Sequence, residues 1–231
     1  MHDRPALLAR LMTVAATLPA SGSLSWRLCE AARQVVVADG VSVAVVGDGH
    51  DRLLVASTGT VSADLEELHA DLGEGPAVSA AQLDELVTAD LTQDEPRWAR
   101  FAESATRRTG ATLVVAVPMR TGTGVAGTLM LHRMDGAVLT ASPAELAELA
   151  DLLTVALLHD SRAVEQAALE GSGARATLNQ AVGMVMAQLS LTAADALAVV
   201  RAHAFALDRS VSEVAIALVD RRFSFSPDDP P

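Results

Sequence analysis

Apolar residues recur at helical spacing in three consecutive segments between Arg175 and Phe223, and this pattern constrains the fold more than any other part of the chain. In the first segment the spacing of three and four residues places one apolar stripe on one face of a helix. Thr192 stands three residues before Asp195, as an N-cap does, so a second helix is predicted from Ala193. The first stripe comprises Leu178, Ala181, Val182, Val185 and Leu189.

A third helix is predicted to begin at Val211 and to end near Arg222. Ser210-Val-Ser-Glu213 has the spacing of a capping box, in which the serine hydroxyl and the glutamate carboxylate each accept from a backbone amide. Three short amphipathic helices predict an all-α three-helix bundle. The expected buried residues are Ala196, Leu197, Val200, Ala204 and Leu207 in the second helix and Val214, Ala215, Leu218 and Val219 in the third.

Gly183 lies inside the first of these helices, where glycine costs about 1 kcal/mol relative to alanine. Close approach of another helix would offset that cost, and the small residues Ala181, Ala204 and Ala215 at inward positions suit tight crossings. We therefore expect a neighbouring helix to contact Gly183.

These helices resemble the ANTAR domain, the three-helix RNA-binding module of bacterial transcription antitermination regulators. The resemblance is carried by Gln180-Ala-Val-Gly-Met-Val-Met186, by Ala196-Leu-Ala-Val-Val-Arg-Ala-His-Ala204 and by Arg209-Ser-Val-Ser-Glu-Val-Ala215. Val182 departs from the pattern, because the family often has lysine there, and the lost charge bears on the strength of RNA binding. The matching positions are Ala181, Gly183, Met186, Ala196, Arg201, Ala204, Arg209, Val214 and Ala215.

The resemblance implies that basic residues of the bundle contact RNA. Arg201, His203 and Arg209 are the first candidates, followed by Arg175, Asn179 and Arg222. Arginine makes forked contacts with phosphate, so such binding is expected to depend strongly on salt, and hairpin loops are read by shape and by unstacked bases. The other interpretation of Arg201 is an ion pair with Asp195 or Asp208.

Charge is distributed unevenly along the 231 residues, whose length favours two domains. The formal net charge of -12 argues against a surface wrapped entirely in nucleic acid. Between Ser172 and Phe225, however, there are five arginines and four acidic residues, so this part of the chain is not acidic. The chain has no lysine, and biased genome composition is a simpler explanation of its 17 arginines than nucleic-acid binding. The single cysteine, Cys29, excludes an internal disulfide, fits a reducing cytoplasm and is expected to be buried in a helix.

The first twenty residues superficially resemble a secretory signal, but the apolar run is short and contains two threonines. An amphipathic helix is the favoured interpretation, since Leu7, Leu8, Leu11, Ala15 and Leu18 recur at helical spacing. No apolar run in the sequence has the length of a membrane span.

The next 140 or so residues, about the size of a single domain, predict an α+β layer with an antiparallel sheet. Ser142-Pro-Ala-Glu145 has the form of a helix start, with a serine cap, proline at the first position and glutamate at the third. The expected strands are 41–46, 52–57, 112–119 and 124–132, with a turn at 47–49; the expected helices are 24–39 and 65–72, and 80–87 and 98–109 are short helices or loops.

This order resembles the GAF domain, a sensor fold related to PAS. The resemblance is carried by Leu72-Gly-Glu-Gly-Pro76, by the hairpin 113–118 with Gly127-Thr-Leu-Met-Leu131, and by the closing helix. It implies that a small molecule or chromophore lies between the sheet and the excursion at about 65–109, and it does not identify that ligand.

Catalytic chemistry has little support in the sequence, and we expect no enzyme, no cofactor and no metal site. His69 and His132 are more simply ordinary histidines than haem ligands, and Trp98 is more simply core than pocket lining. Cys29 has no resolving partner for thiol chemistry. The glutamate pairs Glu66 with Glu67 and Glu145 with Glu148 are expected to lie on solvated helix faces.

The sequence therefore predicts a sensor domain at 1–160, a helical linker at 161–173 interrupted at Gly171-Ser-Gly173, an RNA-binding bundle at 174–225 and a disordered tail at 226–231. The predicted protein is a cytoplasmic, homodimeric, signal-responsive regulator that binds hairpin leader RNA and acts by transcription antitermination. Two alternatives stay open: a signalling adaptor whose bundle binds a protein, and a DNA-binding repressor.

Overall fold

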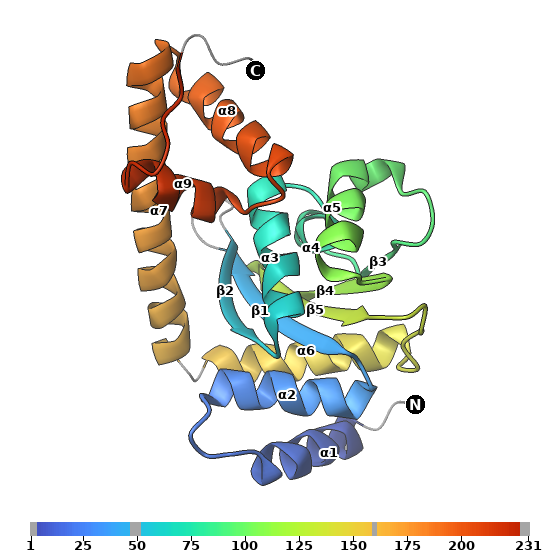
Figure 1. Ribbon diagram of the computed structural model, residues 1–231. Coiled ribbons are helices and arrows are strands. Elements are labelled where there is room, and N and C mark those ends of the chain that lie inside the picture. The colour runs from blue at the N-terminus through green and yellow to red at the C-terminus, as the bar shows by residue number, and fades with distance from the viewer. Residues whose placement is uncertain (1–3, 47–51, 159–160, 227–231) are drawn as a thin grey trace. The chain divides into compact units, whose positions relative to one another are not determined.

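The structure, a computed structural model, describes residues 4–46, 52–158 and 161–226. The chain divides into two compact units, Met1–Ala167 and Ala168–Pro231 (Figure 1). The turn expected at 47–49 and all but the first residue of the expected disordered tail lie outside the described residues.

The amino-terminal unit is built on a five-stranded antiparallel sheet with the strand order β2-β1-β5-β4-β3 (Figure 1). The predicted α+β architecture is confirmed, and the hairpin pairs Leu113 with Arg133 and Thr121 with Gly124. The strand Val87–Asp90 was not predicted, and only its first residue falls within the expected short helix or loop at 80–87. The strands are β1 (Gly40–Val46), β2 (Arg52–Ser57), β3 (Val87–Asp90), β4 (Leu113–Thr121) and β5 (Gly124–Arg133).

Alternation along the strands divides the core between the two faces of the sheet. Val115, Val117 and Leu129 pack with α1 (Arg4–Thr17), α2 (Leu24–Val36) and α6 (Pro143–Leu158), whereas Val114 and Met130 pack with the helices on the other face. Those helices are α3 (Thr60–Leu72), α4 (Pro76–Leu83) and α5 (Ala99–Thr109), preceded by the 3-10 turn Pro96–Trp98 (Figure 1). Trp98 is buried in this second core, as expected.

Local signals in the sequence set several helix ends. The amide of Glu145 donates to Ser142 Oγ (3.3 Å) and the amide of Ser142 donates to Glu145 Oε2 (2.8 Å), which confirms the capping box and corrects the expectation of a solvated face for Glu145. In α1, Leu7, Leu11 and Ala15 are buried, as the predicted amphipathic helix requires, although Leu8 is exposed.

The segment Leu72-Gly-Glu-Gly-Pro76 joins α3 to α4 through two glycines with positive φ. Gly73 (φ 65°) caps α3, and Pro76 begins α4. Gly75 has φ 119°, and a Cβ there would lie 2.7 Å from His69 Cδ2 and 2.9 Å from the Phe101 ring. Any other residue would be strained at this position and would displace His69 or Phe101.

The carboxyl-terminal unit contains the predicted bundle: the carboxyl-terminal part of α7 (Ser161–Leu189), α8 (Ala193–Ala206) and α9 (Val211–Val219). The predicted starts of α8 and α9 are confirmed, because Thr192 accepts from the Asp195 amide (3.2 Å) and Ser210 from the Glu213 amide (3.0 Å). In the described part of the chain no single helix is long and apolar enough to cross a membrane, and only the pair Arg162–Leu189 and Ala193–Ala206, bent by 103°, reaches that length and composition.

Two expectations for α7 are wrong. The helix continues through Gly171-Ser-Gly173 without the predicted break, since two glycines cost only about 2 kcal/mol in a helix of 29 residues, and Ser172 Oγ donates to Ala168 O within it (2.8 Å). Gly183 is exposed, and a Cβ there would meet no heavy atom of the described residues within 4 Å. None of the described helices approaches it, because α8 and α9 pack on the face of α7 that carries Ala181 and Val185.

The Gly183→Ala variant is accordingly expected to be more stable in the bundle by about 1 kcal/mol, since alanine restricts the unfolded chain and fits the helix without a clash. Hydrogen exchange of the neighbouring α7 amides would slow about fivefold. The control is Gly73→Ala, which is expected to destabilise the protein because φ there is 65°. Faster exchange in Gly183→Ala would contradict the open environment of this glycine.

Candidate functional site

The surface of the bundle carries the residues expected to contact RNA. Arg201 is exposed on α8, on a different side from the buried Ala196, Val200 and Ala204. Within the described residues it makes no hydrogen bond or ion pair, so the alternative of a pair with Asp195 or Asp208 is not formed. One carboxylate oxygen of Asp195 instead accepts from the Thr192 hydroxyl (2.6 Å).

His203 does not share a face with Arg201. Two positions along a helix correspond to about 200° around its axis. The His203 ring is half-buried and stacks against Phe223 with a centroid distance of 4.9 Å, while Phe225 meets it edge-on at 5.0 Å. The Phe225 amide donates to Gln188 Oε1 (3.0 Å), which ties the segment after α9 to α7.

The other residues expected to contact RNA differ in their exposure and in their ion pairs within the protein. Arg209 follows α8 with 38% of its side chain exposed, and its Nε is 3.6 Å from Glu213 Oε2, a loose contact. Arg222 pairs with Asp220 (2.8 Å) at the surface. Arg175 and Asn179 are both exposed, one turn apart on α7. Of the other motif positions, Ala181, Ala204 and Ala215 are buried and Met186 is partly buried against the same core.

A buried ion pair in the amino-terminal unit was not predicted. Arg52 Nη2 donates to Glu66 Oε2 (2.8 Å), and the exposed fractions of the two side chains are 5% and 3%. Ser42 Oγ donates to the other carboxylate oxygen (2.8 Å), and Arg52 also donates to Thr128 Oγ1 (2.7 Å). The expectation that Glu66 lies on a solvated face is wrong, because α3 turns it toward the sheet.

The electrostatic environment keeps this pair charged. Burial alone would raise the pKa of Glu66, but the Arg52 guanidinium and the other neighbours of the carboxylate, which include the Ser42 hydroxyl, together outweigh it, and the pKa of Glu66 lies below its ordinary value. Burial, aided by the negative charges of Glu66 and Glu30, raises the pKa of the Cys29 thiol to about 12. Cys29 is therefore protonated at neutral pH and is a poor nucleophile.

The two histidines of this unit that were considered as ligands are buried and engaged. His69 Nδ1 lies 2.6 Å from Leu65 O, and His69 Nε2 accepts from the Ala77 amide (3.1 Å), so both ring nitrogens have partners. His132 Nδ1 lies 3.4 Å from Ser62 Oγ. Burial lowers the pKa of each histidine to about 4. In the described part of the chain no three metal-ligating side chains come together.

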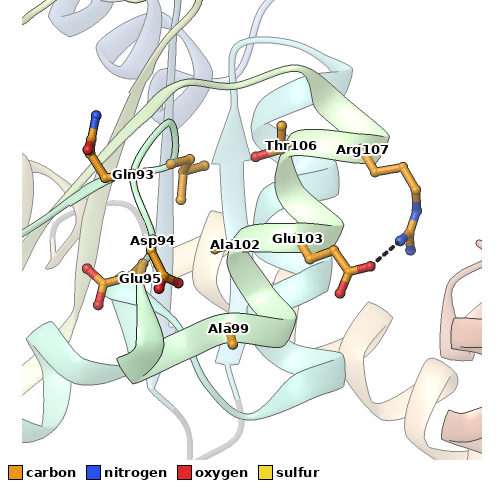
Figure 2. Close-up of a pocket in the computed structure, with 9 residues that line it drawn as sticks. Gln93, Asp94, Glu95, Ala99, Ala102, Glu103, Thr106 and Arg107 are labelled. Atoms are coloured by element: carbon orange, nitrogen blue, oxygen red, sulfur yellow. Dashed lines mark hydrogen bonds and ion pairs between the residues drawn. The ribbon is translucent and has the colours of Figure 1, made fainter.

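An open cavity of about 420 Å³ lies between the loop at 91–95 and α5 (Figure 2). Its volume is within the range of small-molecule sites. Leu91, Ala99 and Ala102 supply apolar surface, and at its edge Glu103 and Arg107 form an ion pair (3.3 Å). The cavity belongs to the excursion where a ligand was expected, but the side of α3, α4 and α5 that meets the sheet is filled by apolar side chains. Two of the three carboxylates that line the cavity are already paired, Glu95 with Arg97 (2.7 Å) and Glu103 with Arg107.

No family model matches the sequence, and no curated protein matches it. Among the solved structures that resemble the chain in fold are two GAF domains. One is the GAF domain of a phosphoenolpyruvate-protein phosphotransferase from Coxiella burnetii, with 16% identity and a TM-score of 0.50, covering 70% of this chain and 98% of that one. The other is the GAF domain of the Acinetobacter phosphoenolpyruvate-protein phosphotransferase, with 19% identity and a TM-score of 0.51, covering 72% of this chain and 99% of that one.

The covered shares of this chain correspond in length to the amino-terminal unit. That unit has the five-stranded antiparallel sheet and the helices on both faces that are described above. The amino-terminal unit of this protein therefore has the fold of a GAF domain.

Proposed function

We propose that this protein is a signal-responsive regulator whose carboxyl-terminal bundle binds structured RNA and acts by transcription antitermination. The observation that carries the proposal is Arg201, which is exposed on α8 without a partner among the described residues. Arg209, at the start of the third helix, is partly exposed and only loosely held by Glu213. Exposed guanidinium groups with no ion pair, or with only a loose one, are available to bind phosphate.

The amino-terminal unit has the role of sensor in this proposal. GAF folds occur in signalling proteins of several kinds, and the cavity along α5 is the candidate place for a small signal. The protonated thiol of Cys29 and the fully engaged ring of His69 fit a non-catalytic sensor. We assign the protein no reaction of its own.

Communication between the units would use α7. This helix runs without a break from Ser161 to Leu189 and crosses the boundary between Ala167 and Ala168, so one continuous helix belongs to both units. A signal that shifts the start of α7 would be transmitted along it to Ala181 and Val185 in the bundle core. In the proposal the working form is a cytoplasmic homodimer.

The test is filter binding of the full chain to hairpin leader RNA, to RNA without a hairpin and to duplex DNA, each at two salt concentrations. The Arg201→Ala, Arg209→Ala double variant is expected to bind the hairpin RNA at least tenfold more weakly, and the slope of log affinity against log salt should fall by about two. Arg97→Ala is the control, because Arg97 is an exposed arginine of the other unit. Unchanged affinity in the double variant would remove the contact assignment.

A second candidate is docking of the bundle on a protein. Leu207 and Ile216 are exposed apolar residues of the bundle, and Val182 stands where the related pattern often has lysine. This candidate predicts salt-insensitive binding that Leu207→Ser or Ile216→Ser abolishes. Preference for the hairpin RNA over the other two nucleic acids in the same assay would reject it.

A further inference from the structure

The exposed residues of α8 are mostly alanines, together with Asp195, Arg201 and Phe205. Ala194, Ala198, Ala202 and Ala206 follow one another at intervals of four residues, and all four are exposed. Residues at this spacing lie above one another on one side of a helix. The side chains that rise from the second half of this face are therefore those of Arg201 and Phe205, which lie beside the alanines.

Phe205 is the unusual member of this face. The residue is 42% exposed, whereas the other phenylalanines of the bundle, Phe223 and Phe225, are partly buried against its core. Phe205 stands one turn after Arg201, so the two side chains project from the same side of the helix. A large exposed aromatic side chain among methyl groups is a surface for another flat group.

The backbone holds this end of α8 firmly. The Leu207 amide donates to His203 O (3.1 Å), the Asp208 amide to Phe205 O (3.2 Å) and the Arg209 amide to Ala204 O (2.9 Å). On the inner side Ala204 and Val200 are fixed in the bundle core. The ring of Phe205 is therefore presented by a rigid element, and the ordering of backbone on binding costs little there.

We propose that Phe205 stacks on an unpaired base of the bound RNA while Arg201 contacts the adjoining phosphate. The proposal rests on the RNA-binding function given above and adds the requirement for an unstacked base. Aromatic rings bind bases through their faces, and arginine supplies the charge that phosphate needs. The small alanine side chains of α8 let a sugar-phosphate backbone approach the helix closely enough for both contacts to form together.

The probe is an RNA hairpin with a fixed stem and a loop selected from a randomised pool on the immobilised full-length protein. Loss of one stacked base weakens binding by about tenfold. Phe205→Leu, which keeps the apolar bulk but removes the aromatic face, is expected to bind this hairpin about tenfold more weakly with an unchanged salt slope. Phe205→Trp is expected to bind within about twofold of the wild type. Arg201→Ala is expected to reduce the salt slope by about one.

The matched control is Leu207→Ala, an exposed apolar residue two positions further along the chain and therefore on another side. It is expected to bind like the wild type. If Phe205→Leu binds as tightly as the wild type, or if Leu207→Ala loses as much affinity as Phe205→Leu, the stacking assignment fails while RNA binding stands. If no selected hairpin binds more tightly than its fully paired stem, the RNA-binding function fails and the stacking fails with it.

Discussion

Replacing Arg52 with methionine is expected to lower the free energy of unfolding of the amino-terminal unit by about 3 to 5 kcal/mol. Methionine has a similar length but leaves the Glu66 carboxylate charged, buried and without its cation. Thr128 Oγ1 also loses its donor. An uncompensated buried charge is among the few single changes with an effect of this size. The midpoint of thermal unfolding should fall by about 10 °C.

Tryptophan fluorescence is the suitable measurement. The two tryptophans, Trp26 and Trp98, both belong to the amino-terminal unit, so their emission reports unfolding of this unit alone. Arg120→Met is the matched control, because Arg120 pairs with Asp84 (2.6 Å) at the surface with exposed fractions of 42% and 56%. Its cost should be about 1 kcal/mol or less.

A double variant, Arg52→Met with Glu66→Leu, should recover much of the loss, because an apolar pair of similar volume replaces both charges. The role assigned to the buried pair would be wrong if Arg52→Met cost no more than Arg120→Met. It would also be wrong if the double variant were as unstable as the sum of the two single variants.

Local signals made much of the fold predictable. The hydroxyl caps at Thr192 and Ser210 and the glycine caps at Gly73 and Gly110 act within a few residues, and the corresponding helix ends were found or nearly found. The nearly continuous apolar runs of β4 and β5 are likewise visible in the sequence, and they reflect a sheet with core on both faces. Both kinds of signal are present in short stretches of sequence.

The features that were missed depend on residues distant in the sequence. β3 has four residues and gains its order from pairing with β4, more than twenty residues later. Glu66 was assigned to solvent because its partner Arg52 comes from another element. A clue was present, since Ser62, Glu66 and His69 recur at helical spacing beside the apolar stripe of α3, and all three are buried. A polar stripe next to an apolar one predicts a buried network when a cation is available nearby.

For the bundle surface, the sequence identified the exposed basic residues but not how they are grouped. Arg201, Arg175 and Asn179 are exposed, whereas His203 is directed to Phe223 and Phe225. The segment after α9 packs back against the bundle, and the apolar pattern of the helices does not predict that contact. The exposure of Phe205 could not be predicted, because the apolar periodicity does not show whether an aromatic residue near a helix end is exposed.

Acidification from pH 7.5 to pH 5 is expected to lower the free energy of unfolding of the amino-terminal unit by about 4 kcal/mol. His69 and His132 each have a folded-state pKa of about 4, below the value of 6.5 from which burial lowers it. Between pH 6.5 and 4 the unfolded chain therefore binds about two more protons than the folded unit, and each contributes about 1.4 kcal/mol per pH unit. The stability that neutral histidines provide is complete above pH 6.5 and is lost as the pH falls.

Urea unfolding followed by tryptophan fluorescence at several pH values measures this slope directly. His69→Gln removes one titrating group, so its slope between pH 6.5 and 4.5 should be about half that of the wild type, whatever its stability at pH 7.5. His132→Asn should halve the slope in the same way. A wild-type stability that is flat from pH 7 to pH 5 would mean that the two rings are hydrated and protonated within the fold. A protonated His69 could no longer accept from the Ala77 amide. The close packing of side chains described between α3 and the sheet would then be wrong.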